Sequence, residues 1–316
     1  ENDAYGMPDG IEQLAASSDS GRVTLIGHSN GGLLGKVLIN KLDDDGQANL
    51  IDQLIMVATP QLGTPKTIAS LLHGTGQGAG AGFLLTNSTA RTIGRNMPGA
   101  YNLLPSAEYL RRVEDPVAMF APGALTDNFI AAYGTSVDNT DELRRFLIGA
   151  EGRDEPTSIN TERPIIANPM LVNQAIENHE QLDVWTVPPG ASIDVTQIAG
   201  WGLDTIEAVR YQTWSSLFRP NDVFFDYGVV FTSEGDETVV YPSAVSMEGV
   251  ETYFFDVFEH NRDESEVNHA SIMEATVLQQ LLDQLVIQNV TQLPDFIQTT
   301  KPTEAEAGKR LRLRGL

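Results

Sequence analysis

The chain has no cysteine, few basic residues and no long apolar run. Its 316 residues include 20 lysines and arginines against 43 aspartates and glutamates, which gives a formal net charge of -23. Without cysteine, the chain cannot use disulfides, a thiol nucleophile or cysteine ligands for a metal. The negative charge would repel a phosphate backbone, so no nucleic-acid partner is expected. No apolar run approaches the length of about 18 residues that a membrane-spanning helix needs, so no transmembrane segment is expected.

What the chain does contain is the composition of an ordinary globular protein, with 41% hydrophobic and 20% charged residues. Lysine is scarce and accounts for five of the 20 basic residues. An acidic, lysine-poor composition fits an extracellular or cell-surface protein, and it also fits a salt-adapted cytoplasm. The one basic cluster lies near the end of the chain and is interpreted as a tail: Lys309, Arg310, Arg312 and Arg314.

The first 65 residues show a βαβ pattern. A short helix is expected over residues 8–16, followed by a strand rich in branched residues at 22–26. Leucine and valine then recur at helical spacing over 33–42, and the continuous apolar run at 54–58 is typical of a buried parallel strand. This order predicts an α/β fold with a parallel sheet.

The rest of the chain divides where the strand signal changes. Residues 66–180 show no strong strand pattern and are interpreted as an insertion. Strands are expected again at 192–199, 223–231 and 253–258. A helix with one apolar side is expected at 271–288. The predicted organisation is a core in two parts, with an insertion between them and a tail after them: residues 1–65, 66–180, 181–288 and 289–316.

A candidate nucleophile lies between the first strand and the helix after it. Residues 27–31, Gly-His-Ser-Asn-Gly, match the pattern G-x-S-x-G, in which the serine occupies a sharp strand-to-helix turn. The flanking glycines are expected to let this turn close, and the backbone N–H of Asn30 is expected to face a developing oxyanion. A glycine-rich helix start with Ser29 as an ordinary N-cap is the alternative interpretation.

A serine needs a base and an orienting acid to attack at neutral pH. Of the five histidines, His28 adjoins the serine, where the turn would direct its side chain away from Ser29. His260 and His269 both follow the last expected strand, which is the usual place of the base when the chain order is serine, acid, histidine. His269 is the favoured base, and a solvated loop position is the alternative interpretation for His260.

Asp236 is the favoured acid. It follows the expected strand at 223–231, and Gly235 before it suits a tight loop that turns the carboxylate inward. Asp204 also follows a strand and is the competing candidate. Asp226 lies in the middle of a strand and is interpreted as structural.

Two acidic stretches could be mistaken for metal sites. Residues 43–46 and 138–142 are rich in aspartate, but neither has the alternating ligand spacing of a calcium loop. We interpret both as solvated turns, and we expect no metal and no cofactor.

Four segments resemble, in their order and sequence, α/β-hydrolase lipases of the lecithin–cholesterol acyltransferase-like and GPI-inositol-deacylase-like branches. They are the serine turn at 27–32, the strand end with its paired prolines at 57–65, the insertion segment at 97–106 and the acid loop at 235–239. Residues 200–202, Gly-Trp-Gly, fit as well. The resemblance spans roughly residues 10–285, and the combination of motifs is more specific than any one of them.

This resemblance implies a mostly parallel sheet flanked by helices, with the large helical insertion as a cap or lid. It also implies that Ser29 is the nucleophile, Asp236 the acid and His269 the base of an enzyme that cleaves or transfers acyl esters, often of lipids. Substrate contacts are expected at four side chains: His28, Leu62, Leu103 and Leu104. Further candidates for an acyl pocket, with ordinary packing inside the cap as the alternative, are Leu84, Leu85 and Ile93.

Three functions stay open at this point. The leading hypothesis is a serine carboxylic-ester hydrolase, and the alternatives are an O-acyltransferase with the same triad and a non-catalytic binding module. Only 26 residues precede Gly27, where the fold normally has several strands and a loop with a second oxyanion donor. The sequence is therefore expected to be the carboxy-terminal part of a longer protein. The oligomeric state is not predicted.

Overall fold

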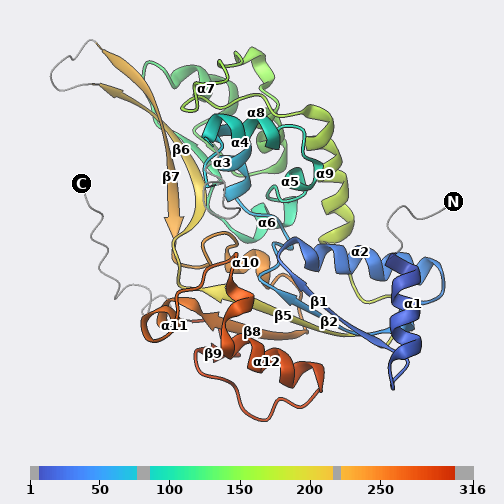
Figure 1. Cartoon of the computed structure of the whole chain (residues 1–316). Coiled ribbons are helices and arrows are strands. Elements are labelled where there is room, and N and C mark those ends of the chain that lie inside the picture. Colours follow the sequence, from blue (N-terminus) through green and yellow to red (C-terminus); the bar gives the residue numbers. More distant parts are fainter. Residues whose placement is uncertain (1–6, 77–85, 216–221, 303–316) are drawn as a thin grey trace. The chain divides into compact units, whose positions relative to one another are not determined.

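The computed structural model describes residues 7–76, 86–215 and 222–302 of the chain. The chain forms two compact units, which can be followed along the sequence by colour in Figure 1. Each unit has its own sheet and is made of separate stretches of sequence. The first unit contains residues 1–61, 184–203 and 233–316, and the second contains residues 62–183 and 204–232.

The first unit is built on a five-stranded sheet. In spatial order its strands are β1 (Val23–His28), β2 (Ile51–Val57), β5 (Asp194–Trp201), β8 (Glu251–Asp256) and β9 (Ile297–Gln298). The first four run parallel, and β9 pairs antiparallel with β8. In the register of the sheet, Ile55 of β2 lies opposite Ile26 of β1 and Thr196 of β5. The predicted parallel sheet is therefore present, with strand ends shifted slightly from the expected ones.

Helices cover both faces of this sheet because its strand β2 is apolar on both sides. Leu54 and Met56 belong to one buried cluster with Ile39, whereas Ile55 and Val57 belong to another. The first cluster draws on α1 (Met7–Ser17) and α2 (Asn30–Asp44), and the second on α12 (Thr276–Val286). This unit also contains the short helices α10 (Tyr241–Ala244) and α11 (Val257–Asp263) and the 3-10 turns Ala48–Leu50 and Ile272–Glu274.

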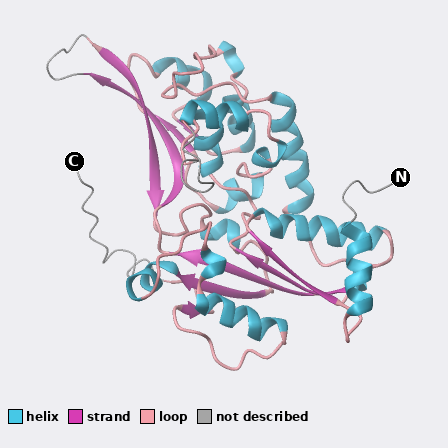
Figure 2. Ribbon diagram, in the orientation of Figure 1, coloured by secondary structure: helices cyan, strands magenta, loops and turns pink. Residues whose placement is uncertain are grey.

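The second unit combines helices with a four-stranded sheet. In spatial order the strands are β4 (Ser136–Val137), β3 (Ala118–Phe120), β6 (Thr205–Ser215) and β7 (Val223–Thr232). Figure 2 shows the long β6–β7 pair beside the helices of this unit. The helices are α3 (Lys66–His73), α4 (Asn87–Gly94), α5 (Pro98–Tyr101), α6 (Ala107–Arg112), α7 (Asp127–Tyr133), α8 (Thr140–Leu147) and α9 (Pro169–Leu182), with a 3-10 turn at Ala150–Gly152. Within the described ranges, neither unit has a helix with the length and apolar character needed to cross a membrane.

The structure differs from the sequence-based expectation in where it places the strand at 223–231. This strand is present as β7, but it belongs to the second unit and pairs antiparallel with β6, which was not predicted. The buried face of β6 carries Tyr211, whose ring stacks on Phe120 at 5.4 Å and on Phe129 at 6.0 Å between centroids. A strand of this sheet and a strand of the first sheet have the same local pattern, and only pairing between distant residues distinguishes them.

The β6–β7 pair is an excursion that starts and ends at the same place in the first unit. Gly202 N–H donates to the Ser233 carbonyl at 3.0 Å, and Leu203 N–H donates to the Gly235 carbonyl at 2.9 Å. Leu203 and Asp236 also form a parallel bridge. The loop that carries Asp236 is therefore held at the carboxyl end of β5, although the excursion of residues 204–232 lies between them in sequence.

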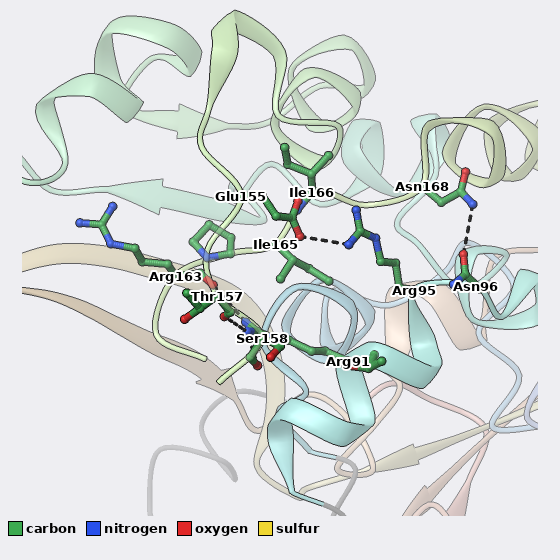
Figure 3. Close-up of polar contacts among 12 residues, drawn as sticks. Arg91, Arg95, Asn96, Glu155, Thr157, Ser158, Arg163, Ile165, Ile166 and Asn168 are labelled. Carbon is green, nitrogen blue, oxygen red and sulfur yellow. Dashed lines mark hydrogen bonds and ion pairs between the residues drawn. The ribbon is translucent and has the colours of Figure 1, made fainter. Parts of the chain in front are cut away.

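A buried arginine fixes the long connection before α9 in the second unit. Figure 3 shows Arg91 of α4 reaching into the loop of residues 157–163. Its guanidinium donates at 2.7–3.3 Å to four backbone carbonyls, those of Thr157, Ser158, Asn160 and Arg163. One helical turn later, Arg95 forms an ion pair with Glu155 at 3.1 Å. One helix therefore secures a connection that has little regular structure of its own.

Candidate active site

Ser29 occupies a strained turn between β1 and α2. Its backbone angles are φ 54° and ψ -129°, a conformation that residues with a side chain rarely adopt. The Ser29 N–H donates to the Val57 carbonyl at 2.9 Å, which fixes the turn against the end of the neighbouring strand. The observed strand, turn and helix are the arrangement in which G-x-S-x-G presents a reactive serine.

The glycines of the turn differ in what they allow. A Cβ added at Gly27 would lie 2.6 Å from the backbone of Gly31, and one added at Gly32 would lie 2.1 Å from Thr59 Oγ1. A Cβ added at Gly31 would meet no atom within 4 Å. The expectation that the turn needs a glycine at both motif positions in order to close is therefore right for Gly27 and wrong for Gly31. The second tight contact is at Gly32, where α2 approaches the segment after β2.

The structure brings Ser29, His269 and Asp236 together within the first unit. His269 Nε2 lies 2.9 Å from Ser29 Oγ, and His269 Nδ1 lies 2.8 Å from Asp236 Oδ2. A carboxylate can only accept, so Nδ1 carries the hydrogen and Nε2 is left to accept the hydroxyl proton of Ser29. This tautomer is the one in which a histidine can act as a base towards serine.

Asp236 is fully buried, and every contact of its carboxylate is with a donor. Oδ1 accepts from the N–H groups of Thr238 at 3.0 Å and Val239 at 2.8 Å, which leaves Oδ2 for His269. Gly200 makes room for the loop, since a Cβ there would lie 2.6 Å from the Asp236 Cβ. The His269 N–H also donates to the Asp236 backbone carbonyl at 3.0 Å. The acid and base loops are therefore joined through both backbone and side chain.

His28 contacts the base loop. Its Nε2–H donates to the backbone carbonyl of His269 at 2.9 Å, and the two rings lie 5.0 Å apart. Burial is the main cause that lowers the pKa of His28, and the nearby His269 lowers it further. Asn30 is the first residue of α2, so its N–H has no carbonyl one turn earlier to bond within the helix. A free N–H at a helix start is suited to a negative charge.

The competing acid and base candidates have other surroundings. His260 is not the solvated loop residue considered above but is 3% exposed on α11, where it packs edge-on against Phe255 and Phe296. Apolar neighbours on two elements explain its burial, and its sequence context alone did not indicate them. Asp226 accepts a hydrogen bond from Gln212 across the β6–β7 pair, as expected of a structural residue. Asp204 lies where the β6 excursion begins.

The expected substrate-contacting leucines lie together in the second unit. Ser106 N–H donates to the Leu62 carbonyl at 3.0 Å, and Thr64 N–H donates to the Leu103 carbonyl at 2.8 Å. Gly63, at φ 80°, permits this pairing because a Cβ there would lie 2.0 Å from the Leu104 carbonyl oxygen. Leu104 also lines a cavity within this unit. Ile93 is 54% exposed, and Leu84, Leu85 and the basic cluster at 309–314 lie outside the described residues.

Two further histidines of the second unit were not singled out by sequence reasoning. His73 is fully buried: its Nδ1–H donates to the Thr161 carbonyl at 2.7 Å, and the Tyr211 hydroxyl donates to its Nε2 at 2.8 Å. Burial lowers the pKa of His73 to about 3, so the ring is neutral. His179 of α9 bonds Asp183 Oδ1 through Nδ1 and the Asn102 carbonyl through Nε2, both at 2.9 Å.

Metal ligands are the other role that the acidic stretches of the sequence could have. Within residues 7–76, 86–215 and 222–302, no group of three or more histidine, aspartate or glutamate side chains is placed to hold a metal ion. The acidic stretch at 138–142 instead starts α8, where Asn139 Oδ1 accepts from the Glu142 N–H at 3.0 Å. This contact is an ordinary helix N-cap.

Comparisons with known proteins agree with this architecture. A family model described as lecithin:cholesterol acyltransferase matches residues 1–273. A solved structure described as "The crystal structure of Tle4-Tli4 complex" contains a chain that is similar to this one, with a TM-score of 0.55 and 16% sequence identity. The match covers 92% of this chain and 64% of that chain, so the present chain spans less than two thirds of its length. The comparison with curated proteins gives no match. The predicted α/β-hydrolase fold is confirmed by the parallel sheet, the family model and the structural likeness.

Proposed function

This chain belongs to the lecithin:cholesterol acyltransferase family, and from that premise we propose that it is a serine ester hydrolase acting on lipid-like acyl esters. The observation that carries the proposal is the line of hydrogen bonds from Ser29 Oγ through His269 to Asp236, with both distances below 3.0 Å. Serine, histidine and carboxylate in this geometry generate an alkoxide-like nucleophile at neutral pH.

In the proposed reaction, Ser29 Oγ attacks the carbonyl carbon of the ester while its proton moves to His269 Nε2. The bond to the departing alcohol then breaks, and the proton passes from Nε2 to the leaving oxygen. Water, deprotonated by the same nitrogen, attacks the acyl-enzyme, and the acid is released with Ser29 restored. Asp236 stays ionised throughout and stabilises the imidazolium.

The surroundings of the triad support the same chemistry. We assign the Asn30 N–H as an oxyanion donor, because it is unpaired within α2 and lies next to the nucleophile in sequence. One such donor is typically worth about 10²–10³ in rate. We assign His28 to holding the His269 loop through the bond to its carbonyl, rather than to contact with substrate. An accurately held base loop preserves the short Ser29–His269 distance on which proton transfer depends.

We infer an apolar, esterified substrate from the family and from the charge of the chain. The net charge of -23 disfavours adhesion to anionic lipid surfaces, so apolar contacts rather than charge would bring the ester to Ser29. The insertion at residues 66–180 is proposed as the cap of the enzyme, and Leu62, Leu103 and Leu104 remain proposed substrate contacts. An extracellular or cell-surface location is the proposed setting, with a salt-adapted cytoplasm as the alternative.

Acyl transfer is the second candidate function, and the family itself favours it. The same acyl-enzyme would form, and an alcohol would take the place of water in the second half of the reaction. Product analysis with and without an added long-chain alcohol separates the two. Free acid in both cases indicates a hydrolase, whereas a new ester in the presence of the alcohol indicates a transferase.

A fluorophosphonate probe tests the assignment of the nucleophile directly. We expect it to modify Ser29 alone, as read by mass spectrometry of the digested protein, and we expect Ser29→Ala to abolish both labelling and ester hydrolysis. Ser17→Ala, at an exposed serine on α1, is the matched control and should label like the parent protein. Labelling at another serine, or unchanged hydrolysis in Ser29→Ala, would mean that the triad is not the reactive site and would favour a binding module.

A further inference from the structure

A cavity of about 280 Å³ lies wholly within the second unit, between α8, α9 and the start of α6. Its volume is close to the lower end of the range for small-molecule sites, about 300–1000 Å³. The lining residues of α8 recur at spacings of three and four, as do those of α9, so each helix faces the cavity with one continuous stripe. The cavity is therefore a continuous space between two helix faces rather than an isolated packing gap.

One end of the cavity is apolar. Leu143 and Leu147 of α8 face it from one side, and Val172, Ala175 and Ile176 of α9 face it from the other. Ala175 is 2% exposed, and its short side chain leaves the space open where a larger residue would fill it. Water in such a place finds few polar partners, and apolar cavities of this kind take up apolar ligands instead.

The other end of the cavity is polar, because the lining of α9 changes along the helix to His179, Glu180 and Asp183. His179 bonds Asp183 and the Asn102 carbonyl, both at 2.9 Å, and both of these partners are acceptors. The Asn102 carbonyl can only accept, so the hydrogen of this bond is carried by His179 Nε2. Arg144 lines the same space and donates to Asn173 Oδ1 at 2.8 Å.

We propose that this cavity is a binding site for a single unbranched aliphatic chain with an uncharged hydroxyl head group. The chain would lie against the apolar end, and the hydroxyl would lie at the His179–Asp183 end. The lining already carries charges of both signs, since Arg144 lines it together with Glu180 and Asp183. A head group of either charge would therefore meet a like charge there, and a carboxylate would in addition meet an acidic protein.

The site shares no residue with the proposed triad, although Leu104 lines it and is also a proposed substrate contact. Every residue that lines it belongs to the second unit, whereas Ser29, Asp236 and His269 belong to the first. Binding at this cavity can therefore be measured with the nucleophile removed, and the labelling of Ser29 can be measured with the cavity filled. Either proposal can fail while the other stands.

The test is calorimetric titration of the full chain carrying Ser29→Ala with three probes that share a ten-carbon chain: 1-decanol, decanoate and decyltrimethylammonium. We expect one saturable site for 1-decanol and at least ~10-fold weaker binding of both charged probes, since a buried charge without a partner is costly. No saturable binding of 1-decanol, or tighter binding of either charged probe, overturns the proposal.

Variants place the binding in the cavity. Ala175→Trp should fill the apolar end and weaken 1-decanol binding at least ~10-fold, because a packed interior leaves no room for the ligand. Ala175→Leu should weaken it less, and circular dichroism shows whether each variant folds. Ala131→Trp, at an exposed alanine on α7, is the matched control and should bind like the parent. Unchanged binding in folded Ala175→Trp or Ala175→Leu overturns the assignment, and fluorophosphonate labelling of these variants with Ser29 restored reports on the triad separately.

Discussion

Among the residues that the structure describes, each unit contains one buried aspartate–histidine pair, and the two pairs have nearly the same distances. In the first unit, His269 Nδ1 lies 2.8 Å from Asp236, and in the second unit, His179 Nδ1 lies 2.9 Å from Asp183. The difference is at the other ring nitrogen. In His269 it faces the hydroxyl of Ser29, and in His179 it faces the backbone carbonyl of Asn102.

That second partner decides what each histidine can do. A hydroxyl can donate, so His269 Nε2 is free to accept a proton from Ser29 and act as a base. A carbonyl cannot donate, so His179 Nε2 must carry its own hydrogen and has no proton to accept from this partner. An aspartate–histidine contact is therefore not evidence of catalysis until the opposite nitrogen has been examined.

The largest expected effect separates the two histidines by activity. His269→Ala should lower kcat for hydrolysis of a p-nitrophenyl ester by about 10⁴–10⁶-fold, because the residues of a triad act as one unit. His179→Ala should leave kcat per folded molecule within about threefold, because no proton passes through it. The measurement is steady-state hydrolysis, with the concentration of protein taken from absorbance and its folding checked by circular dichroism. Equal losses of kcat in the two folded variants would contradict the proposal that His269, and not His179, transfers the proton.

Substitution of the two aspartates, Asp236 and Asp183, should have effects on kcat that differ in the same direction as those of the two histidines. Asp236→Asn should lower kcat about 10⁴-fold, because an amide in this place favours the wrong tautomer of His269. Asp183→Asn should leave kcat almost unchanged. The same ester assay measures both, and a small effect of Asp236→Asn would make Asp204 the next acid to test.

Part of this comparison can be predicted from the sequence, and part of it cannot. Ser29, Asp236 and His269 are indicated by a local motif and by their order along an α/β chain, both of which are local or topological signals. The contact between His179 and Asp183 also has a local signal, because residues four positions apart lie on the same face of a helix, but it is not among the sequence-based predictions. The contact of His28 with the His269 carbonyl joins residues 241 positions apart, and no local pattern encodes it.

The same limit applies to the fold. The continuous apolar run at 54–58 predicts the buried strand that the structure has as β2, whereas β6 is not predicted and the strand predicted at 223–231 belongs to a second sheet. This sheet is defined by pairing with β3, far away in sequence, and by the aromatic cluster around Tyr211. The carboxyl end of β5 is joined to the Asp236 loop across the excursion of residues 204–232, which only the folded chain reveals.

A third prediction sharpens the comparison through stability. The side chains of His179 and Asp183 are 5% and 8% exposed, so His179→Leu would leave a buried carboxylate without its hydrogen-bond partner. Leaving such a group unpaired should lower the free energy of unfolding by about 1–3 kcal/mol, measured by urea titration. The double variant His179→Leu/Asp183→Leu should recover much of this loss, because an apolar pair leaves no polar group without a partner. A double variant as unstable as the single one would contradict the view that the unpaired carboxylate causes the loss.

The neutral histidine His73 extends the comparison to pH. Burial lowers its pKa from 6.5 to about 3 in the folded chain, so below pH 6.5 the unfolded chain binds a proton that the folded chain does not. Stability should therefore fall as the pH is lowered through this window, by up to about 1.4 kcal/mol for each pH unit. Urea unfolding at about pH 7 and about pH 5.5 measures the loss, and His73→Gln should reduce it. The same loss in both proteins would assign it to other groups.

The smallest expected effect concerns His28, which touches the triad only through the backbone of His269. His28→Ala removes one hydrogen bond, at 2.9 Å, from the loop that carries the base, and should lower kcat about tenfold with KM unchanged. His28→Gln, whose amide can donate to the same carbonyl, should recover part of the rate. A residue that contacts substrate would instead raise KM, and glutamine would not restore it, so the kinetic pattern distinguishes the two roles. The proposed base, His269, is then positioned by three contacts: Asp236 fixes its tautomer, the Ser29 hydroxyl donates to its free nitrogen, and His28 holds the backbone that keeps both in reach.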